Sequence, residues 1–430
     1  MSADRITETS TIRSILFRRL AAVCAFALEA TTPADAASSY VWAQFTTGGL
    51  QARAVTRDAA CPPAQIDGVA AAMTPRASPD ADFPILVCTL DLPRSAGRVS
   101  VDGAALALPP PRVDRLVVIG DTGCRLKGLY WQECNSPDSW PFAHIATSAA
   151  ATAPGLVLHV GDYYYRESAC PPLRGSCAGS PHGDNWASWE ADFFAPAAPL
   201  LAAAPFVFVR GNHENCERGR RGWARLLSPT PYLGDACALR EPSYSVDLGG
   251  PTLVVMDNTA AEDRAVDAAL APDFARELTA AEAIRGPVWY AFHKPIYSTI
   301  RVTAGATIGD NKTLGEAARA GLPSNVQALL SGHLHTFQAA SYVEDYPIQI
   351  VAGHGGDAMD LFMPANFDGL RIDRVTVAQG RSVGGVFGFV TLEREKEDWL
   401  LNDRDAEGKP LLGCLLRGRK LDCDRRGPSR

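Results

Sequence analysis

Short runs of consecutive apolar residues recur along most of this chain, and a small or polar residue follows each run. Five of these runs occupy residues 116–119, 156–160, 206–209, 288–292 and 326–330, and two of them are interrupted by one polar residue each, His159 and Gln327. Continuous apolar runs of this length are typical of strands that are buried on both faces. Ala-rich stretches with helical character, at residues 142–151, 186–201 and 273–283, lie between them. The alternation predicts an α/β core with buried sheets.

The pattern before residue 109 is different. Residues 40–46, 83–92 and 99–108 read as strands separated by Gly, Pro and Asp turns. We therefore predict a small β-rich domain over residues 37–108, followed by a stiff proline linker at 109–111. The main α/β domain is expected over residues 112–395, closed by strands near 375–378 and 386–392. A C-terminal segment, 396–430, includes a strand near 399–401 and ends in a basic tail, interpreted as solvated.

The N-terminus has the pattern of an export signal. Arginines precede an apolar run at residues 20–28, and Ala-Asp-Ala at 34–36 offers a cleavage site. The run is too short to span a bilayer. We predict a signal peptide over residues 1–36 and an exported protein, periplasmic or extracellular, with no membrane segment in its mature form. Glu29 and the long polar start leave a disordered or amphipathic arm as the alternative.

Cysteine usage supports export. The chain has 11 cysteines, and removing Cys24 with the signal leaves an even number. The remaining cysteines fall into near neighbours: Cys61 with Cys88, Cys124 with Cys134, Cys170 with Cys177, Cys216 with Cys237, and Cys414 with Cys423. We expect disulfides formed in an oxidising compartment, although sequence alone does not fix the connectivity. A cysteine-bound zinc is disfavoured because the chain has no Cys-x-x-Cys pair.

Chain length and net charge limit the number of domains and the kind of binding partner. The chain has 430 residues, enough for two domains, and a formal net charge of -7. A negative net charge argues against nucleic acid as a partner, because phosphate backbones favour a basic surface.

A polar motif follows each of the five apolar runs. The motifs are Gly120-Asp121-Thr122-Gly123, Gly161-Asp162 with Tyr165, Gly211-Asn212-His213-Glu214, the isolated His293, and Gly332-His333-Leu334-His335. Polar side chains at the ends of strands are where α/β folds place their sites. The predicted metal ligands are Asp121, Asp162, Tyr165, Asn212, His293, His333 and His335, enough for two metal ions if one carboxylate bridges them. A two-metal centre is well suited to hydrolysing phosphate esters.

Tyr165 narrows the choice of metals. A phenolate is a costly ligand for a divalent ion at neutral pH, because the unperturbed pKa of tyrosine is about 10. A trivalent ion such as Fe(III) deprotonates it readily. The sequence therefore indicates one trivalent and one divalent ion.

This set of motifs resembles the purple acid phosphatases, within the calcineurin-like metallophosphoesterases, over roughly residues 112–392. Gly123 stands where most of the wider superfamily has a histidine ligand, and Tyr165 stands where the purple subgroup has its tyrosinate. One position departs from the family: Tyr290, where a valine is common, but it lies in a strand and is not a ligand. The resemblance implies a four-layer α-β-β-α sandwich as the catalytic domain, and the block before residue 109 matches the family's N-terminal β domain in location and strand content.

The resemblance also implies a role for each site residue. Asp121, Tyr165 and His335 would bind Fe(III), and Asn212, His293 and His333 would bind a divalent ion, which is iron, zinc or manganese. Asp162 would bridge the two ions, and a metal-bound hydroxide would attack phosphorus. His213 would stabilise the transition state or protonate the leaving group. Glu214 would orient His213 or a ligand imidazole.

Other polar residues near the motifs are weaker candidates. His182, His354 and Arg125 could contact substrate. Arg166 could contact phosphate as well, but a surface salt bridge is at least as good an interpretation for Arg125 and for Arg166. His159 is expected to be a core residue, and His144 a surface one. Asp257-Asn258 is interpreted as a turn near the site.

The leading hypothesis is an exported hydrolase of small phosphomonoesters with an acid optimum, the optimum being implied by the family. A phosphodiesterase on the same fold is the nearest alternative. A non-catalytic metal-containing binding protein is disfavoured, because His213 is present together with every ligand. The sequence does not give the physiological substrate or the oligomeric state.

Overall fold

The computed structural model describes residues 40–423, apart from 235, 304–305, 309–310 and 361–363. These residues belong to one compact unit, Ser38–Arg430. The predicted signal peptide and the last residues of the basic tail lie outside the described residues.

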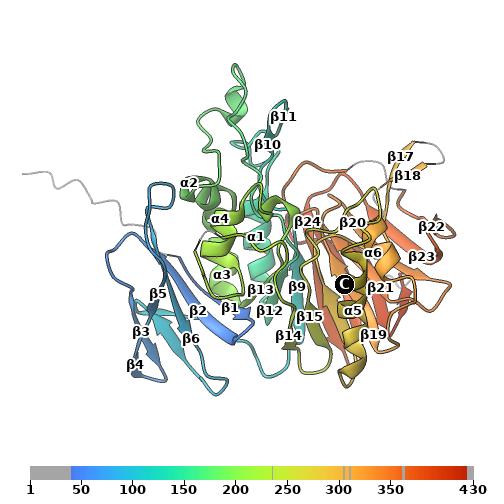
Figure 1. Cartoon of the computed structure of the whole chain (residues 1–430), viewed down its shortest axis with the longest axis horizontal. Coiled ribbons are helices and arrows are strands. Elements are labelled where there is room, and N and C mark those ends of the chain that lie inside the picture. Colours follow the sequence, from blue (N-terminus) through green and yellow to red (C-terminus); the bar gives the residue numbers. More distant parts are fainter. Residues whose placement is uncertain (1–39, 235, 304–305, 309–310, 361–363, 424–430) are drawn as a thin grey trace, which may run out of the picture. The chain divides into compact units, whose positions relative to one another are not determined.

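Two large sheets form the framework of the described chain (Figure 1). The first has eleven strands in the order β27-β26-β25-β24-β9-β12-β13-β1-β2-β6-β5. At its centre β9, β12 and β13 run parallel, and Leu158 pairs with both Val118 and Val207. The loops that follow these three strands therefore leave from the same edge of the sheet. The bounds are β1 Tyr40–Thr46, β2 Gly49–Thr56, β5 Thr74–Ala77, β6 Leu86–Asp91, β9 Arg115–Ile119, β12 Leu156–His159, β13 Phe206–Phe208, β24 Gly388–Glu395, β25 Asp398–Asp405, β26 Pro410–Arg417 and β27 Lys420–Asp422.

The second sheet has eight strands in the order β14-β15-β16-β19-β21-β20-β23-β22. Its strands β15, β16, β19 and β21 are parallel, with Tyr290 paired to Val254 and to Leu329. The bounds are β14 Tyr244–Asp247, β15 Thr252–Val255, β16 Val288–Ala291, β19 Val326–Ser331, β20 Phe337–Tyr342, β21 Ile348–Ala352, β22 Arg371–Ile372 and β23 Val375–Val383.

Alternating side chains of the central strands separate the layers. Val117 and Ile119 of β9 pack into a core with helices α1 (Phe142–Ala151) and α3 (Ala195–Ala203). Leu116 and Val118 face the opposite way, into a second core shared with the other sheet. A third core joins that sheet to α5 (Ala271–Thr279) and α6 (Lys312–Ala317). The layers follow the order α-β-β-α, which confirms the predicted fold class.

The strands before residue 109 divide between two sheets. β1 pairs in parallel with β13 through Gln44 and Phe206, so β1, β2, β6 and β5 extend the first large sheet. A separate four-stranded sheet contains β3 Pro63–Ile66, β4 Val69–Ala72, β7 Val99–Val101 and β8 Ala104–Ala105. A β-rich N-terminal region is therefore present, whereas its division into an independent domain at residues 37–108 stays a prediction.

Two of the predicted helices are interrupted. Residues 186–201 form α2 (Trp186–Trp189), a π-helical turn η2 (Glu190–Phe194) and α3, and α5 continues into η5 (Ala280–Ala283). The shorter elements are β10 Leu126–Lys127, β11 Tyr130–Trp131, η1 Gly175–Cys177, η3 Asn212–Glu214, α4 Arg220–Gly222, η4 Trp223–Leu227, β17 Ile300–Thr303 and β18 Ala306–Ile308.

All five predicted cysteine pairs form disulfides. The pairs Cys124–Cys134 and Cys170–Cys177 each close one loop, and the two loops pack against each other in one small apolar cluster. Among the helices of the described residues, none has the length and apolar character needed to cross a membrane.

Candidate metal centre

Asp162 lies at the meeting point of two groups of polar side chains. Its Oδ2 is 2.8 Å from the Tyr165 hydroxyl and 3.1 Å from Nε2 of His293. Asp162 is fully buried after β12, in the middle of the parallel strands. One carboxylate oxygen is thus shared between residues that come from different sheets, which is the position of a bridging ligand.

The first group surrounds the Tyr165 hydroxyl. Its oxygen lies 3.2 Å from Oδ1 of Asp121 and 3.0 Å from Nε2 of His335. The other ring nitrogen of His335, Nδ1, donates to the carbonyl of Ala358 at 2.8 Å, which leaves Nε2 facing the group. The residues that the resemblance assigns to Fe(III) therefore converge.

The second group surrounds His293. Its Nε2 lies 3.1 Å from Oδ1 of Asn212, and its Nδ1 donates to the carbonyl of Val160 at 2.8 Å. The ring of His333 lies edge-on to that of His293, with centroids 5.2 Å apart. All seven predicted ligands therefore gather at one edge of the two sheets, in the two groups that the resemblance implies, although metal binding by them stays a prediction.

Three of these residues have a strained backbone. The φ angles of Asp121, Asp162 and His333 are 56°, 58° and 70°, in the left-handed region that residues other than glycine rarely adopt. Such conformations cost roughly 1–3 kcal/mol each and cluster at functional sites. In this conformation the backbone N–H of His333 donates to Oδ2 of Asp121 at 3.0 Å. This hydrogen bond connects the two groups of candidate ligands.

The glycines of the motifs make room for neighbouring ligands. A Cβ atom on Gly211 would overlap Oδ1 of Asp162, and one on Gly332 would overlap Oδ2 of Asp121. Each glycine therefore allows the carboxylate of another motif to approach its backbone, which explains why Gly precedes the ligand.

The charges of the cluster call for a cation. Burial raises the pKa of Tyr165 well above its ordinary value, and Asp162 and Asp121 raise it further. Burial alone would lower the pKa of His293, but Asp162 raises it to about 9. Ligand atoms of Asp121, Asp162 and His293 lie within 4.8 Å of one another. A donor set of carboxylates, imidazoles, phenol and amide fits metal ions, which would invert these shifts.

Glu214 anchors the backbone of two ligand loops. Its Oε1 accepts from the N–H groups of Tyr163 and Tyr164, and its Oε2 accepts from those of Asp162 and Gly211, at 2.9 to 3.2 Å. Burial and Asp162 raise its pKa to about 8 despite these donors. Its hydrogen bonds among the described residues go to backbone rather than to the imidazole expected from the sequence, because η3 turns its side chain into the loop.

His213 lies against the ring of Tyr165, with the two ring centroids 3.9 Å apart and the planes tilted. The backbone N–H of His213 donates to Oδ1 of Asp162 at 2.8 Å. Nδ1 of His213 is 2.6 Å from Oε1 of Glu167. Sequence reasoning missed Glu167, and its place two residues after Tyr165 is the signal that could have indicated it.

Asp192 is a second residue that sequence reasoning missed. It is fully buried in η2, and its oxygens accept from the N–H groups of Cys124, Tyr165 and Arg166. Nε of Arg166 donates to Asp192 at 2.6 Å. Arg166 is therefore held in a buried ion pair, not in the expected surface one, and the pair fixes the loop that carries Tyr165. A carboxylate followed directly by two phenylalanines in a helical stretch was the available signal.

Arg125 lies over the ring of Tyr165, with Cζ 5.1 Å from the centroid. Its Nε donates to Oδ1 of Asp357 at 3.0 Å, and Asp357 is fully buried. The salt bridge, one of the two predicted interpretations, is therefore present. Contact of Arg125 with substrate stays a prediction.

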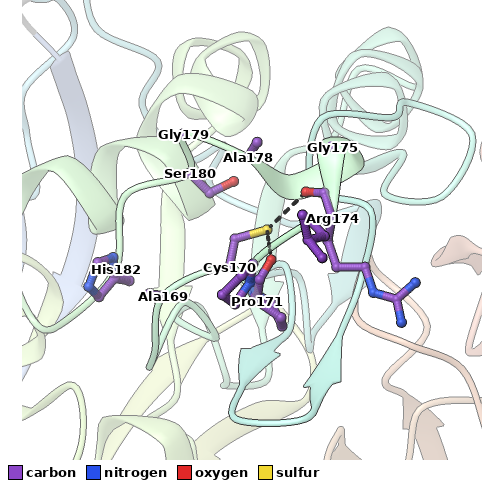
Figure 2. Close-up of a pocket in the computed structure, with 11 residues that line it drawn as sticks. Ala169, Cys170, Pro171, Arg174, Gly175, Ala178, Gly179, Ser180 and His182 are labelled. Carbon is purple, nitrogen blue, oxygen red and sulfur yellow. Dashed lines mark hydrogen bonds between the residues drawn. The ribbon is translucent and has the colours of Figure 1, made fainter.

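The three other histidines singled out from the sequence lie in different environments. His182 lines a cavity of about 620 Å³ formed by the loop that Cys170–Cys177 closes (Figure 2). His354 is fully buried 2.9 Å from Oδ1 of Asp403, so its imidazole is engaged away from the ligand groups and the structure does not support substrate contact. His159 is a core residue as predicted, with Nε2 3.0 Å from Oγ1 of Thr122.

Fold and site together define a metal-dependent phosphoesterase, a hydrolase with a candidate dinuclear centre. The sequence model of the calcineurin-like phosphoesterases matches residues 114–337, more than half of the 430 residues. The chain belongs to this family, which confirms the wider family named from the motifs, whereas membership of the purple acid phosphatase subgroup stays a prediction.

Solved structures agree on the fold. The purple acid phosphatase PPD1 from yellow lupin (Lupinus luteus) is 14% identical, with a TM-score of 0.56, and the match covers 87% of this chain and 73% of that one. A structure of PhoD is 10% identical, with a TM-score of 0.56, and covers 91% and 92%. A search of curated protein sequences finds no match. At these identities the likeness shows the fold alone.

Proposed function

We propose that this protein hydrolyses phosphomonoesters with a centre of two metal ions. The observation that supports this most directly is the shared oxygen of Asp162, which lies between the Tyr165 group and the His293 group at 2.8 and 3.1 Å. A pair of metal ions held by a bridging carboxylate binds both the attacking and the leaving oxygen of an in-line displacement.

Each of the two proposed metal positions has its own set of side chains. Asp121, Tyr165 and His335 would hold a trivalent ion, and Asn212, His293 and His333 a divalent one, with Asp162 between them. When bound, the ions supply the nucleophile and neutralise charge on the phosphate. The raised pKa of Tyr165 supports the trivalent assignment, because a strong Lewis acid is needed to ionise so deeply buried a phenol.

His213 is the candidate proton donor to the leaving alkoxide. It lies beside Asp162 without being one of the seven ligands, with Nε2 3.9 Å from Oδ2 of that carboxylate. Glu167 contacts the opposite nitrogen, Nδ1, which holds the ring with Nε2 toward the site.

Export and an acid optimum complete the proposal. Five disulfides support folding in an oxidising compartment outside the cytoplasm, periplasmic or extracellular. The acid optimum follows from the proposed trivalent ion, which makes the nucleophile available at low pH.

Initial rates on an aryl phosphomonoester and the matching bis-aryl diester test the proposal, measured at acid pH on one preparation of known metal content. Faster monoester turnover is expected. Faster diester turnover would replace the proposal with a phosphodiesterase. No turnover of either ester with two metals bound would favour a binding protein.

A further inference from the structure

The loop after β15 packs against the backbone that carries His293. Oδ1 of Asn258 accepts from the N–H groups of His293 and Lys294, at 3.2 and 3.1 Å, and Nδ2 of Asn258 donates to the carbonyl of Lys294 at 2.7 Å. The turn expected at Asp257-Asn258 therefore fixes the position from which His293 enters the site.

Lys294, the residue after His293, contacts a further carboxylate, that of Asp263. Its Nζ donates to the carbonyl of Ala261 at 2.7 Å and to Oδ2 of Asp263 at 3.1 Å. Oδ1 of Asp263 accepts from Nδ2 of Asn311 at 2.7 Å. Asp263 is therefore held by a cation and an amide, which leaves its side chain little freedom.

The carboxylate held in this way faces His333. Oδ2 of Asp263 lies 3.6 Å from Nε2 of His333. A carboxylate opposite Nε2 favours the tautomer with its proton there. Nδ1 of His333 is then the nitrogen left for a cation.

We propose that Asp263 is a positioning residue for His333, and that it sets the affinity of the second, divalent metal site. The inference rests on the proposed two-metal function and goes beyond it by naming a residue outside the ligand set. Ligand imidazoles commonly donate their second N–H to a carboxylate, which fixes the ring and increases its basicity as a ligand. Lys294, next to the ligand His293, keeps that carboxylate in place.

A purely structural role would have different consequences. If Asp263 served only to close its loop with Lys294 and Asn311, its loss would lower the stability of the fold and affect both metal positions alike. If it positions His333, its loss affects one position, because Asp121, Tyr165 and His335 have no contact with it among the described interactions. Selectivity between the two sites is therefore the quantity to measure.

The test is a chelator-competition titration of the full protein with Zn²⁺ or Mn²⁺, with metals per chain counted by elemental analysis. Asp263→Asn keeps the size of the side chain and is expected to weaken the second ion about 10–100-fold while the first stays bound. Asp263→Glu should recover part of the loss. Asp267→Asn is the matched control: Asp267 lies on the same loop and accepts from the N–H groups of Ala269 and Leu270, away from the site.

Three outcomes would overturn the inference. If the parent protein binds two ions and Asp263→Asn binds the second ion with unchanged affinity, this inference is contradicted and the proposed function is not. Equal weakening of both ions reduces Asp263 to a structural residue. A parent protein that binds fewer than two ions contradicts the proposed function and this inference with it. Should Asp263→Asn fail to fold, Lys294→Gln tests the same link, with a smaller selective loss expected.

Discussion

Glu167 and His213 are in close contact beside the candidate metal centre, with Oε1 and Nδ1 2.6 Å apart. Lys127, 3.4 Å from the other oxygen, and Arg218 also contact Glu167. Burial alone would raise the pKa of Glu167, but His213 and these cations lower it, so the carboxylate stays ionised in weak acid. The pair would hold a protonated imidazole in place for the leaving group.

Glu167→Gln should therefore lower kcat by about 10–100-fold with little change in KM, because the proton donor His213 loses the partner that orients it while substrate still binds. Glu133→Gln, on a neighbouring loop where Glu133 accepts from Ser139, is the control. A kcat of Glu167→Gln equal to that of the parent would contradict the assignment.

Glu214 should prove essential to the fold of the site. In Glu214→Gln an NH2 group replaces one oxygen that accepts two backbone N–H donors, in either orientation of the amide. We expect the metal-free protein to lose roughly 2–5 kcal/mol of unfolding free energy, from two unsatisfied buried donors. Denaturant titration measures this. Glu217→Gln, at an exposed position, should change stability little, and equal stability of Glu214→Gln and the parent would refute the anchoring role.

Tyr165 should give the protein its colour. In the metal-free protein the raised pKa keeps the phenol protonated at neutral pH. Addition of Fe(III) should then release a proton and produce a phenolate absorption band in the visible range, which Tyr165→Phe should lack. Tyr163→Phe is a matched control, because that neighbouring buried hydroxyl donates to the carbonyl of Val209 and not to the site. A visible band that survives in Tyr165→Phe would exclude Tyr165 as the tyrosinate.

The sequence predicts best what depends on short stretches of chain. The ligands stand directly after buried strands, so recognising the strands also locates the site. The disulfides join near neighbours, such as Cys170 with Cys177, so grouping the cysteines by spacing indicated the pairs that form. The helix α1 spans Phe142–Ala151 as predicted, since its Ala-rich sequence and apolar face agree.

The partners of the ligands could not be predicted in the same way. Asp357 accepts from Arg125 although the two residues are 232 positions apart in the sequence. Asp263 contacts His333 although it lies on the loop after β15, far from His333 in the sequence. Pairings of this kind depend on tertiary packing, which leaves no local pattern. The same reason explains why β1 joins the large sheet through Gln44 and Phe206, whereas the local pattern indicated only a strand.

The central claim is that Asp162 joins two metal ions into one catalytic centre. The most direct measurement is the rate of phosphate release from an aryl phosphomonoester by Asp162→Asn and by the parent, at equal metal supply. The substitution keeps the size of the side chain and an oxygen that can accept from the N–H of His213, so the fold should persist. We predict a fall of about 1,000-fold, on the scale of losing a group that acts in the transition state. A rate within about tenfold of the parent would contradict the account, because a fall of that size corresponds to only about 1.4 kcal/mol of barrier.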